Sequence, residues 1–105
     1  MPEIGYLIPL EVGGLNWLRF ELMTVGGVVM LFVAQYETML DGKVLPVVRY
    51  DNHHGFCHRD RLNRRGDVVE KTPIGGSPGE VATLGANDIR ANWEAYLEQF
   101  LGDAE

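Results

Sequence analysis

The sequence predicts one α+β domain, in which an antiparallel meander of about five to six strands carries a single C-terminal helix on one face. Turn signals recur at regular intervals: Gly13-Gly14, Gly26-Gly27, Asp41-Gly42, residues 52–55 and residues 63–66. Apolar and polar residues alternate between these turns, whereas after residue 77 apolar residues recur at spacings of three and four. The sheet is therefore expected over residues 5–72 and the helix over residues 78–101, within one domain of 105 residues.

The first two strands are expected at residues 7–12 and 17–24. The second strand alternates clearly, since Leu18, Phe20 and Leu22 fall on one side. The other side carries Trp17, Arg19, Glu21 and Met23. This pattern is typical of a half-buried strand.

Residues 28–40 and 44–50 are expected to form a hairpin, because Asp41-Gly42 is a signal for a two-residue type I′ turn. A regular hairpin with this turn places Ala34 opposite Arg49 and Gln35 opposite Val48. A bulge would shift this register by one residue and turn Arg49 to the other face. The sequence is compatible with both the regular and the bulged register.

Residues 56–62 and 68–71 are expected to form the next hairpin, with Gly66 supplying the positive φ of its turn. A capping box then starts the helix, with Ser77 as N-cap, Pro78 at the first helical position and Glu80 reaching back.

The helix carries an apolar stripe that should lie on the sheet: Ala82, Gly85, Ala86, Ile89, Trp93, Tyr96 and Phe100. Gly79 and Gly85 each disfavour helix by roughly 1 kcal/mol relative to alanine. The firm part of the helix is therefore expected to begin nearer Asn87.

Composition narrows the classes of function. The chain has 15 acidic and 9 basic residues, and its net charge of -6 excludes the wide basic footprint of a duplex-binding protein. Any contact with RNA would have to be local. The single cysteine excludes an internal disulfide framework. The N-terminus lacks the basic region of a signal peptide. The apolar run at residues 28–34 is shorter than the ~20 residues of a membrane-spanning helix. We expect a cytoplasmic protein that does not associate with membranes.

The segment "VVRYDNHHGFCHRD" at residues 47–60 gathers most of the chemically versatile side chains. Arg49 and Asp51 project to one side near the end of one expected strand, and His58 and Asp60 share a face of the next. The four side chains meet if the two strands pair in matching register. Cys57 points to the opposite side in this arrangement, and a buried structural thiol is expected there.

This set of side chains suits the cleavage of a phosphodiester without a metal ion. His54 and His58 are the candidate acid and base, and Asp51 is the carboxylate that would orient them. Arg49 or Lys71 would hold the phosphate. This interpretation requires neither a metal nor another cofactor.

Two other interpretations of the segment remain open. In the first, it is a polar network at a strand end, in which Asp51 closes an Asx-turn over Asn52 and His54, and Arg49 pairs with a nearby carboxylate. In the second, it is a metal site, because Asp51, His54, His58 and Asp60 are ligand types at short spacing.

A second apolar face of the sheet is expected at Val29, Leu31 and Val33, with Val47 as a further candidate. One helix cannot cover both faces of a sheet. The sequence therefore also predicts a homodimer or a module that binds a partner protein through this second face.

The segment R-Y-D-N-x-H-G-x-x-H-R-D at residues 49–60, followed by "IRANWEAYLEQF", resembles a family of small uncharacterised prokaryotic proteins. More distantly, through Arg49, Asp51, His54 and His58, it is similar to the TumE-type toxins of toxin–antitoxin pairs. The resemblance spans about the C-terminal two thirds of the chain. It implies a toxin-like cytoplasmic protein that acts on RNA and is neutralised by an antitoxin-like protein partner.

Overall fold

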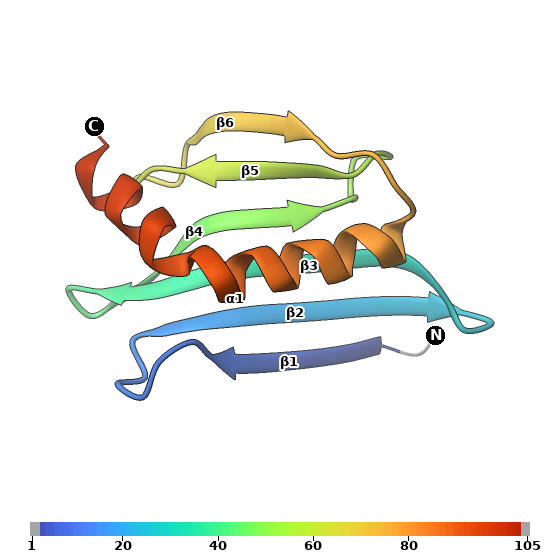
Figure 1. Cartoon of the computed structure of the whole chain (residues 1–105), viewed down its shortest axis with the longest axis horizontal. Helices are drawn as coiled ribbons and strands as arrows, with labels where there is room; N and C mark the ends of the chain where they lie inside the picture. Colours follow the sequence, from blue (N-terminus) through green and yellow to red (C-terminus); the bar gives the residue numbers. More distant parts are fainter. Residues whose placement is uncertain (1–2, 104–105) are drawn as a thin grey trace.

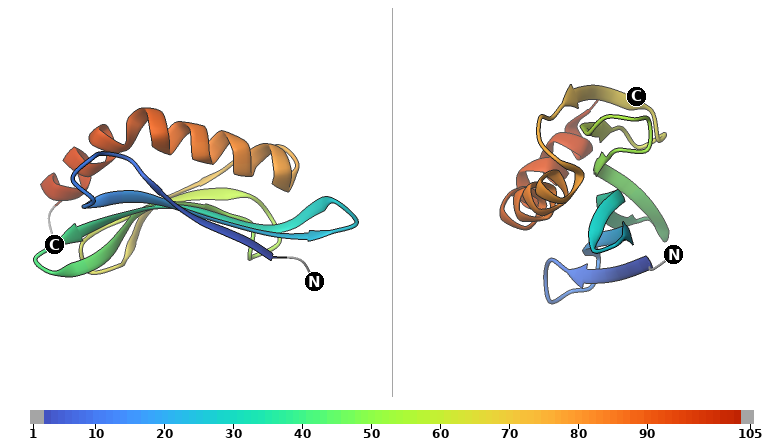
Figure 2. Two further views of the ribbon diagram at one scale, coloured as in Figure 1. Left: turned by 90° about the horizontal axis from the view of Figure 1, so that it is seen from below. Right: turned by 90° about the vertical axis from the view of Figure 1, so that its right-hand side faces the viewer.

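The computed structural model describes residues 3–103, which form a six-stranded antiparallel sheet and one helix (Figure 1). The strands are β1 (Glu3–Pro9), β2 (Asn16–Val25), β3 (Val28–Leu40), β4 (Lys43–Asp51), β5 (His58–Leu62) and β6 (Val68–Pro73), and the helix is α1 (Pro78–Gly102). The sheet order β1-β2-β3-β4-β5-β6 follows the chain, as expected for a meander. The predicted α+β fold is confirmed. Figure 2 shows the strong twist of the sheet and α1 on one of its faces.

The first strand lies earlier than predicted, at Glu3–Pro9 rather than at residues 7–12. The Glu11 carboxylate accepts hydrogen bonds from the Leu15 backbone N–H, at 3.0 Å, and from the Asn16 side chain, at 3.2 Å. These contacts fold the segment before β2 into a loop. The acidic side chain that seemed to belong to a strand therefore stabilises the turn instead.

The hairpin between β3 and β4 contains the bulge that decides the position of Arg49. The turn has positive φ at both Asp41 (53°) and Gly42 (76°), as a type I′ turn requires. The register then shifts between Tyr36 and Glu37, so that Arg49 lies opposite Gln35 and not opposite Ala34. The regular register is thus wrong and the bulged one is correct.

A signal for this bulge is present in the sequence, because Pro46 lies opposite Glu37 where the register shifts. Proline cannot donate a ladder hydrogen bond, and inside a sheet it is confined to edges, strand starts and bulges. The bulge places Arg49 on the face of the sheet that α1 does not cover. We call this face the open face.

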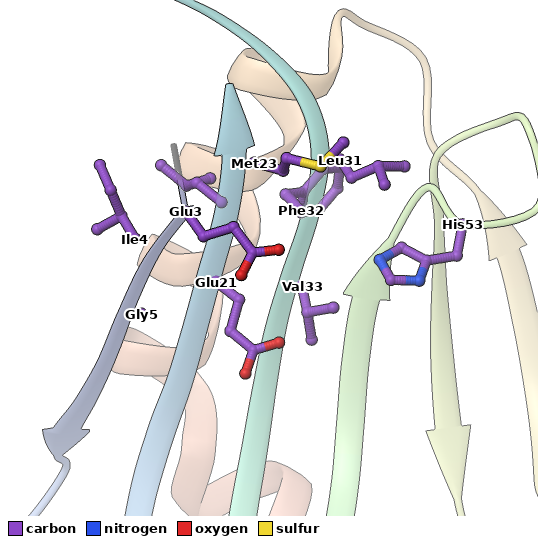
Figure 3. A pocket seen from close by; sticks show the side chains of 10 residues that line it. Glu3, Ile4, Gly5, Glu21, Met23, Leu31, Phe32, Val33 and His53 are labelled. Carbon is purple, nitrogen blue, oxygen red and sulfur yellow. The ribbon is translucent and has the colours of Figure 1, made fainter. Parts of the chain in front are cut away.

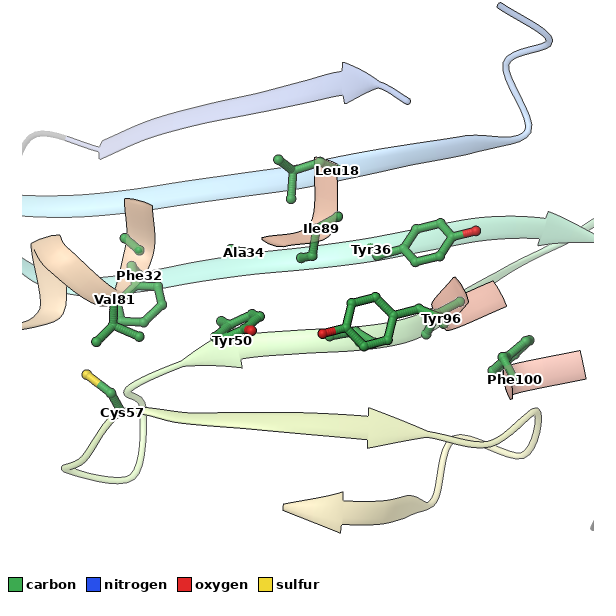
Figure 4. Close-up of a cluster of buried hydrophobic side chains, with 13 residues drawn as sticks. Leu18, Phe32, Ala34, Tyr36, Tyr50, Cys57, Val81, Ile89, Tyr96 and Phe100 are labelled. Carbon is green, nitrogen blue, oxygen red and sulfur yellow. The ribbon is translucent and has the colours of Figure 1, made fainter. Parts of the chain in front are cut away.

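The core lies between α1 and the other face of the sheet (Figure 4). Its most completely buried side chains include Leu18, Phe32, Ala34, Tyr36, Val48, Ile89 and Phe100. The alternation in β2 predicted Leu18, and the helical stripe predicted Ile89 and Phe100, because each belongs to the apolar side of its element.

The helix runs without interruption from Pro78 to Gly102, so the expectation that it becomes firm only near Asn87 is wrong. Its capping box is formed, with Ser77 Oγ accepting from the Glu80 backbone and Glu80 accepting from the Ser77 backbone. Gly85 is a close-packing position: a Cβ atom built there would lie 2.6 Å from Cγ of Tyr50. The glycine lets the helix approach the sheet closely. No helix within residues 3–103 is long and apolar enough to span a membrane.

The predicted second apolar face is only partly formed. The register of the β2–β3 pair shifts between Met23 and Thr24, which interrupts the alternation of side chains along β3. Val29 therefore packs on the helix side, next to Gly79. Leu31 and Val33 remain on the open face. Most of the other open-face positions carry polar side chains, which form the candidate site.

Candidate functional site

Strand register brings the predicted site residues together on the open face. Asp51 lies opposite His58 in the β4–β5 pair, and Arg49 lies opposite Asp60. In the β5–β6 pair, Asp60 lies opposite Lys71. Directly opposed residues of antiparallel strands share a face, so five polar side chains from three strands are neighbours. The strand-to-strand arrangement expected for residues 47–60 is therefore present.

His58 lies between two buried carboxylates. Its Nδ1 is hydrogen-bonded to Oδ1 of Asp60 at 3.1 Å, and its Nε2 lies 3.1 Å from Oδ1 of Asp51. The second contact is close but is not a hydrogen bond, and Nε2 is buried without one. His58 is only 1% exposed. The two carboxylates, one from β4 and one from β5, therefore fix the orientation of the imidazole ring.

The turn after β4 covers His58. The rings of His54 and His58 are nearly parallel, with an interplanar angle of 20° and centroids 6.1 Å apart. The Phe56 ring contacts His58 from another direction, with centroids 5.3 Å apart. Both covering residues are exposed. Of the two candidate acid–base histidines, only His54 is therefore accessible to a substrate.

Asp51 and Asn52 hold this turn in place. Oδ1 of Asp51 accepts a 3.3 Å hydrogen bond from the His53 backbone, which is an Asx-turn contact of the kind expected in the polar-network interpretation. Buried Asn52 donates to the Met30 carbonyl at 2.9 Å and accepts from the Phe32 N–H at 3.0 Å. Its amide thus continues the pairing with β3 beyond the end of β4. Sequence reasoning missed this role of Asn52, for which no local signal exists.

Arg49 is a half-buried cation without an ion pair in the described part of the chain. Its Nε donates a 2.6 Å hydrogen bond to Oε1 of Gln35, a neutral amide. The carboxylate of Asp60, its partner across the strands, is directed to His58 and to Lys71 instead. The charge of Arg49 is therefore available for an anion at the open face.

Lys71 differs from Arg49 because its charge is already compensated. Its Nζ lies 3.1 Å from Oδ1 of Asp60, and about half of its side chain is exposed. The same Asp60 oxygen thus contacts both Lys71 and His58. Of the two predicted phosphate-binding residues, Arg49 has the stronger geometric case.

A second polar cluster, which sequence reasoning missed, surrounds Glu37 on the same face. The indole of Trp17 donates to Oε1 at 2.7 Å, and Nε of Arg19 donates to Oε2 at 2.9 Å. Gln35 donates to the same carboxylate and also accepts from Arg49, which links the two clusters. Burial alone would raise the pKa of Glu37, but the hydrogen bonds from Arg19, Trp17 and Gln35 outweigh it, so this pKa is lowered.

A cavity of about 420 Å³ opens on the same face, along β1, β2 and β3 (Figure 3). Its lining includes the apolar side chains of Met23, Leu31 and Val33, together with Glu3 and Glu21. His53 from the turn also lines it, whereas none of the predicted catalytic and phosphate-binding residues does. The cavity and the proposed chemical site are therefore neighbouring but distinct parts of the open face.

The other two expectations for residues 47–60 concern a metal and a thiol. Among residues 3–103, no group of three or more histidine, cysteine, aspartate and glutamate side chains is arranged to hold a metal ion. Cys57 is buried and belongs to the core cluster, as expected for a structural thiol. Burial, with a smaller contribution from the charge of Asp51, raises the pKa of Cys57 and disfavours the reactive thiolate.

Comparison with protein families finds a model that matches residues 1–105 and is described as a domain of unknown function, DUF7718. The match covers the whole chain. Comparisons with curated proteins and with solved structures found no match.

Proposed function

The chain belongs to the DUF7718 family, and we propose that it is a toxin-like cytoplasmic protein that cleaves RNA without a metal ion at the open face of its sheet. One observation carries this proposal. Arg49, which has no ion pair within residues 3–103, lies beside a buried histidine–carboxylate cluster on a face that no helix covers. A cation that forms no ion pair with the described residues suits a phosphate ligand.

We assign different roles to the two histidines because their exposure differs. His54 is exposed and would take the proton from a ribose 2′-hydroxyl, whose oxygen then attacks the adjacent phosphorus. The bond from phosphorus to the leaving 5′ oxygen breaks, and that oxygen takes up a proton from water. His58 is closed to solvent, so it acts as a positioning residue that supports His54.

The remaining residues of the proposed site bind or orient. Arg49 would contact the phosphate, where its planar guanidinium stabilises the charge that develops on the phosphoryl oxygens. Lys71 would contribute less to phosphate binding than Arg49, because Asp60 already compensates its charge. Asp51 fixes the turn that carries His54 and also contacts His58. The proposed phosphate contact is local, as a chain of net charge -6 requires.

Expression in cells, together with cleavage of single-stranded RNA by the purified protein, tests this proposal. Arg49→Ala and His54→Ala should remove growth inhibition, and His54→Ala should lower the cleavage rate by roughly 10²–10⁴-fold, as expected for loss of a general base. Arg90→Ala is the matched control, since this exposed arginine belongs to α1, which packs on the other face of the sheet. Co-expression of the protein encoded by the adjacent gene, as the candidate antitoxin-like partner, should restore growth. A wild type that neither inhibits growth nor cleaves RNA, or variants that equal the wild type, would refute the proposal.

The positioning role of His58 needs a readout other than loss of folding. His58→Gln should change the pH profile of cleavage while its far-UV circular dichroism stays that of the wild type. A variant with wild-type rates at every pH would remove His58 from the mechanism.

The cavity favours a second candidate function, a non-enzymatic module that binds a partner. Its apolar floor and the two carboxylates of Glu3 and Glu21 are complementary to a partner segment that carries a lysine or arginine among apolar residues. Leu31→Lys and Val33→Lys should abolish binding to an antitoxin-like partner with a basic segment, as measured by light scattering of the mixture. A complex that forms equally well with both variants would count against this function.

A further inference from the structure

The two edges of the sheet are protected to different degrees. The outer strand β6 carries the charged residues Glu70 and Lys71 within its length, a typical device against pairing with another chain, whereas a terminal proline is common to β6 and β1. The outer strand β1 has the sequence EIGYLIP, with Glu3 as its only charge. Tyr6 and Leu7 are 53% and 59% exposed. β1 is thus an exposed, apolar edge strand.

The backbone of β1 offers unpaired groups in a regular pattern. The Leu10 N–H donates to the Asn16 carbonyl at 3.0 Å, and in an antiparallel ladder the hydrogen-bonded positions alternate. The backbone groups of Gly5 and Leu7 therefore point away from β2, toward the open edge. The backbone of Pro9 also points toward the open edge, so the N–H that proline lacks would not have bonded to β2.

Two side chains of β1 on the helix side, Ile4 and Tyr6, are exposed, whereas Ile8 is partly buried against the core. Ile4, Tyr6 and Ile8 lie opposite apolar residues of β2, and the ring of Tyr6 stacks on that of Phe20 with centroids 6.5 Å apart. The helix lies over β2, β3 and β4, and β1 runs beside it (Figure 2), so Ile4 and Tyr6 form an uncovered stripe. A covering element at this edge would bury both the stripe and the backbone.

We propose that β1 pairs with β1 of a second copy, antiparallel, about a twofold axis that passes beside Tyr6. Gly5 then lies opposite Leu7 of the second copy, and their outward backbone groups exchange hydrogen bonds. Ile4 lies opposite Ile8, and Tyr6 lies opposite Tyr6 of the second copy. The two sheets become one continuous sheet with both helices on the same side.

The composition of β1 favours a second copy over an unrelated strand. In this register each helix-side apolar residue of one copy lies opposite an apolar residue of the other copy. The twofold axis repeats the same contacts, as an isologous interface requires. Glu3 falls opposite Pro9, so the only carboxylates lie at opposite ends of the interface and do not repel each other. The inference is independent of the proposed RNA cleavage, because none of the residues assigned to that reaction lies on β1.

Sedimentation equilibrium of the full chain tests the dimer. The wild type should have twice the mass of the 11.7 kDa chain. Leu7→Pro should weaken the dimer by about 100-fold, because it removes an outward N–H from each copy and leaves the β1–β2 ladder intact. Tyr6→Lys should weaken it by like-charge repulsion at the axis, and Val69→Lys on β6 is the control that should stay dimeric. Circular dichroism identifies any variant that fails to fold.

Cross-linking tests the register. Opposed residues at a position without hydrogen bonds have Cα atoms about 4.5 Å apart, within the range of a disulfide. Tyr6→Cys should therefore form a covalent dimer on oxidation, whereas Ile8→Cys and the wild type with its buried Cys57 should not. A monomeric wild type, a dimer unaffected by both β1 variants, or a dimer broken by Val69→Lys alone would overturn the proposal. So would cross-linking of Ile8→Cys as efficient as that of Tyr6→Cys.

Discussion

Phe32 and His58 are both 1% exposed, yet they lie on opposite faces of the same sheet and are buried by different means. Phe32 is covered by α1 and surrounded by apolar side chains. His58 has no helix above it and is enclosed by Asp51, Asp60 and its own turn. The helix-covered face should therefore respond to changes in volume, and the open face to changes in charge and hydrogen bonding.

The largest effect is expected on the helix-covered face. Phe32→Ala leaves a cavity in the core and should lower the free energy of unfolding by about 3–5 kcal/mol, as measured by urea denaturation. Its neighbour Leu31 is the matched control, because it lies on the open face and is only half-buried. Leu31→Ala should cost less than about 2 kcal/mol. Equal losses for the two variants would mean that the two faces do not differ in this way.

On the open face, removal of a charge should matter although the volume stays constant. Glu37→Gln weakens the hydrogen bonds from Trp17 and Arg19, and should cost about 1.5–3 kcal/mol at pH 7. Glu21→Gln is the control, because this exposed carboxylate forms only a 3.8 Å ion pair with Arg19.

The effect of Glu37 should also depend on pH in a defined direction. The folded-state pKa of Glu37 is lowered, so the carboxylate stabilises the fold fully above its usual pKa of 4.5. This stabilisation is lost as the pH falls from there through the folded-state pKa. The difference in unfolding free energy between wild type and Glu37→Gln should shrink over that range. A difference that stays constant down to the acid transition would contradict the assignment.

How closely the helix approaches its face can be tested at two glycines. Gly85→Ala gains roughly 1 kcal/mol of helix propensity, but its Cβ would lie 2.6 Å from Cγ of Tyr50. We expect the clash to prevail and the variant to lose about 1–3 kcal/mol. At Gly79 the nearest atom, Cγ2 of Val29, lies at 3.7 Å, so Gly79→Ala should be neutral or stabilising by up to about 1 kcal/mol. A stabilised Gly85→Ala would show that the interface can open without cost.

The helix-covered face could be predicted from the sequence because its signals are local. Alternation in β2 and the helical stripe each identify an apolar side without reference to any other element. Gly85 shows the limit of such reasoning. Its low propensity suggested a weak helix, whereas its role depends on Tyr50, which lies far away in the sequence.

The open face could be predicted only in part because it depends on register. The pairing of Asp51 with His58 follows from a short turn between adjacent strands and was expected as one outcome. The position of Arg49 depends on a bulge, for which Pro46 was the available signal. The Glu37 cluster draws on β2 and β3 together, so no single segment contains a pattern for it.

The smallest expected effect concerns the start of the helix that creates the difference between the faces. Ser77 Oγ accepts a 3.2 Å hydrogen bond from the Glu80 backbone, and Ser77→Ala should lower the free energy of unfolding by about 1 kcal/mol. Ser77→Asp keeps a capping oxygen and is the matched control, which should stay close to the wild type. Because α1 lies on one side of the sheet only, hydrogen exchange should quicken near Val81 while the amides around His58 keep their protection. Equal acceleration at both places would show that the open face depends on the helix as strongly as the core does.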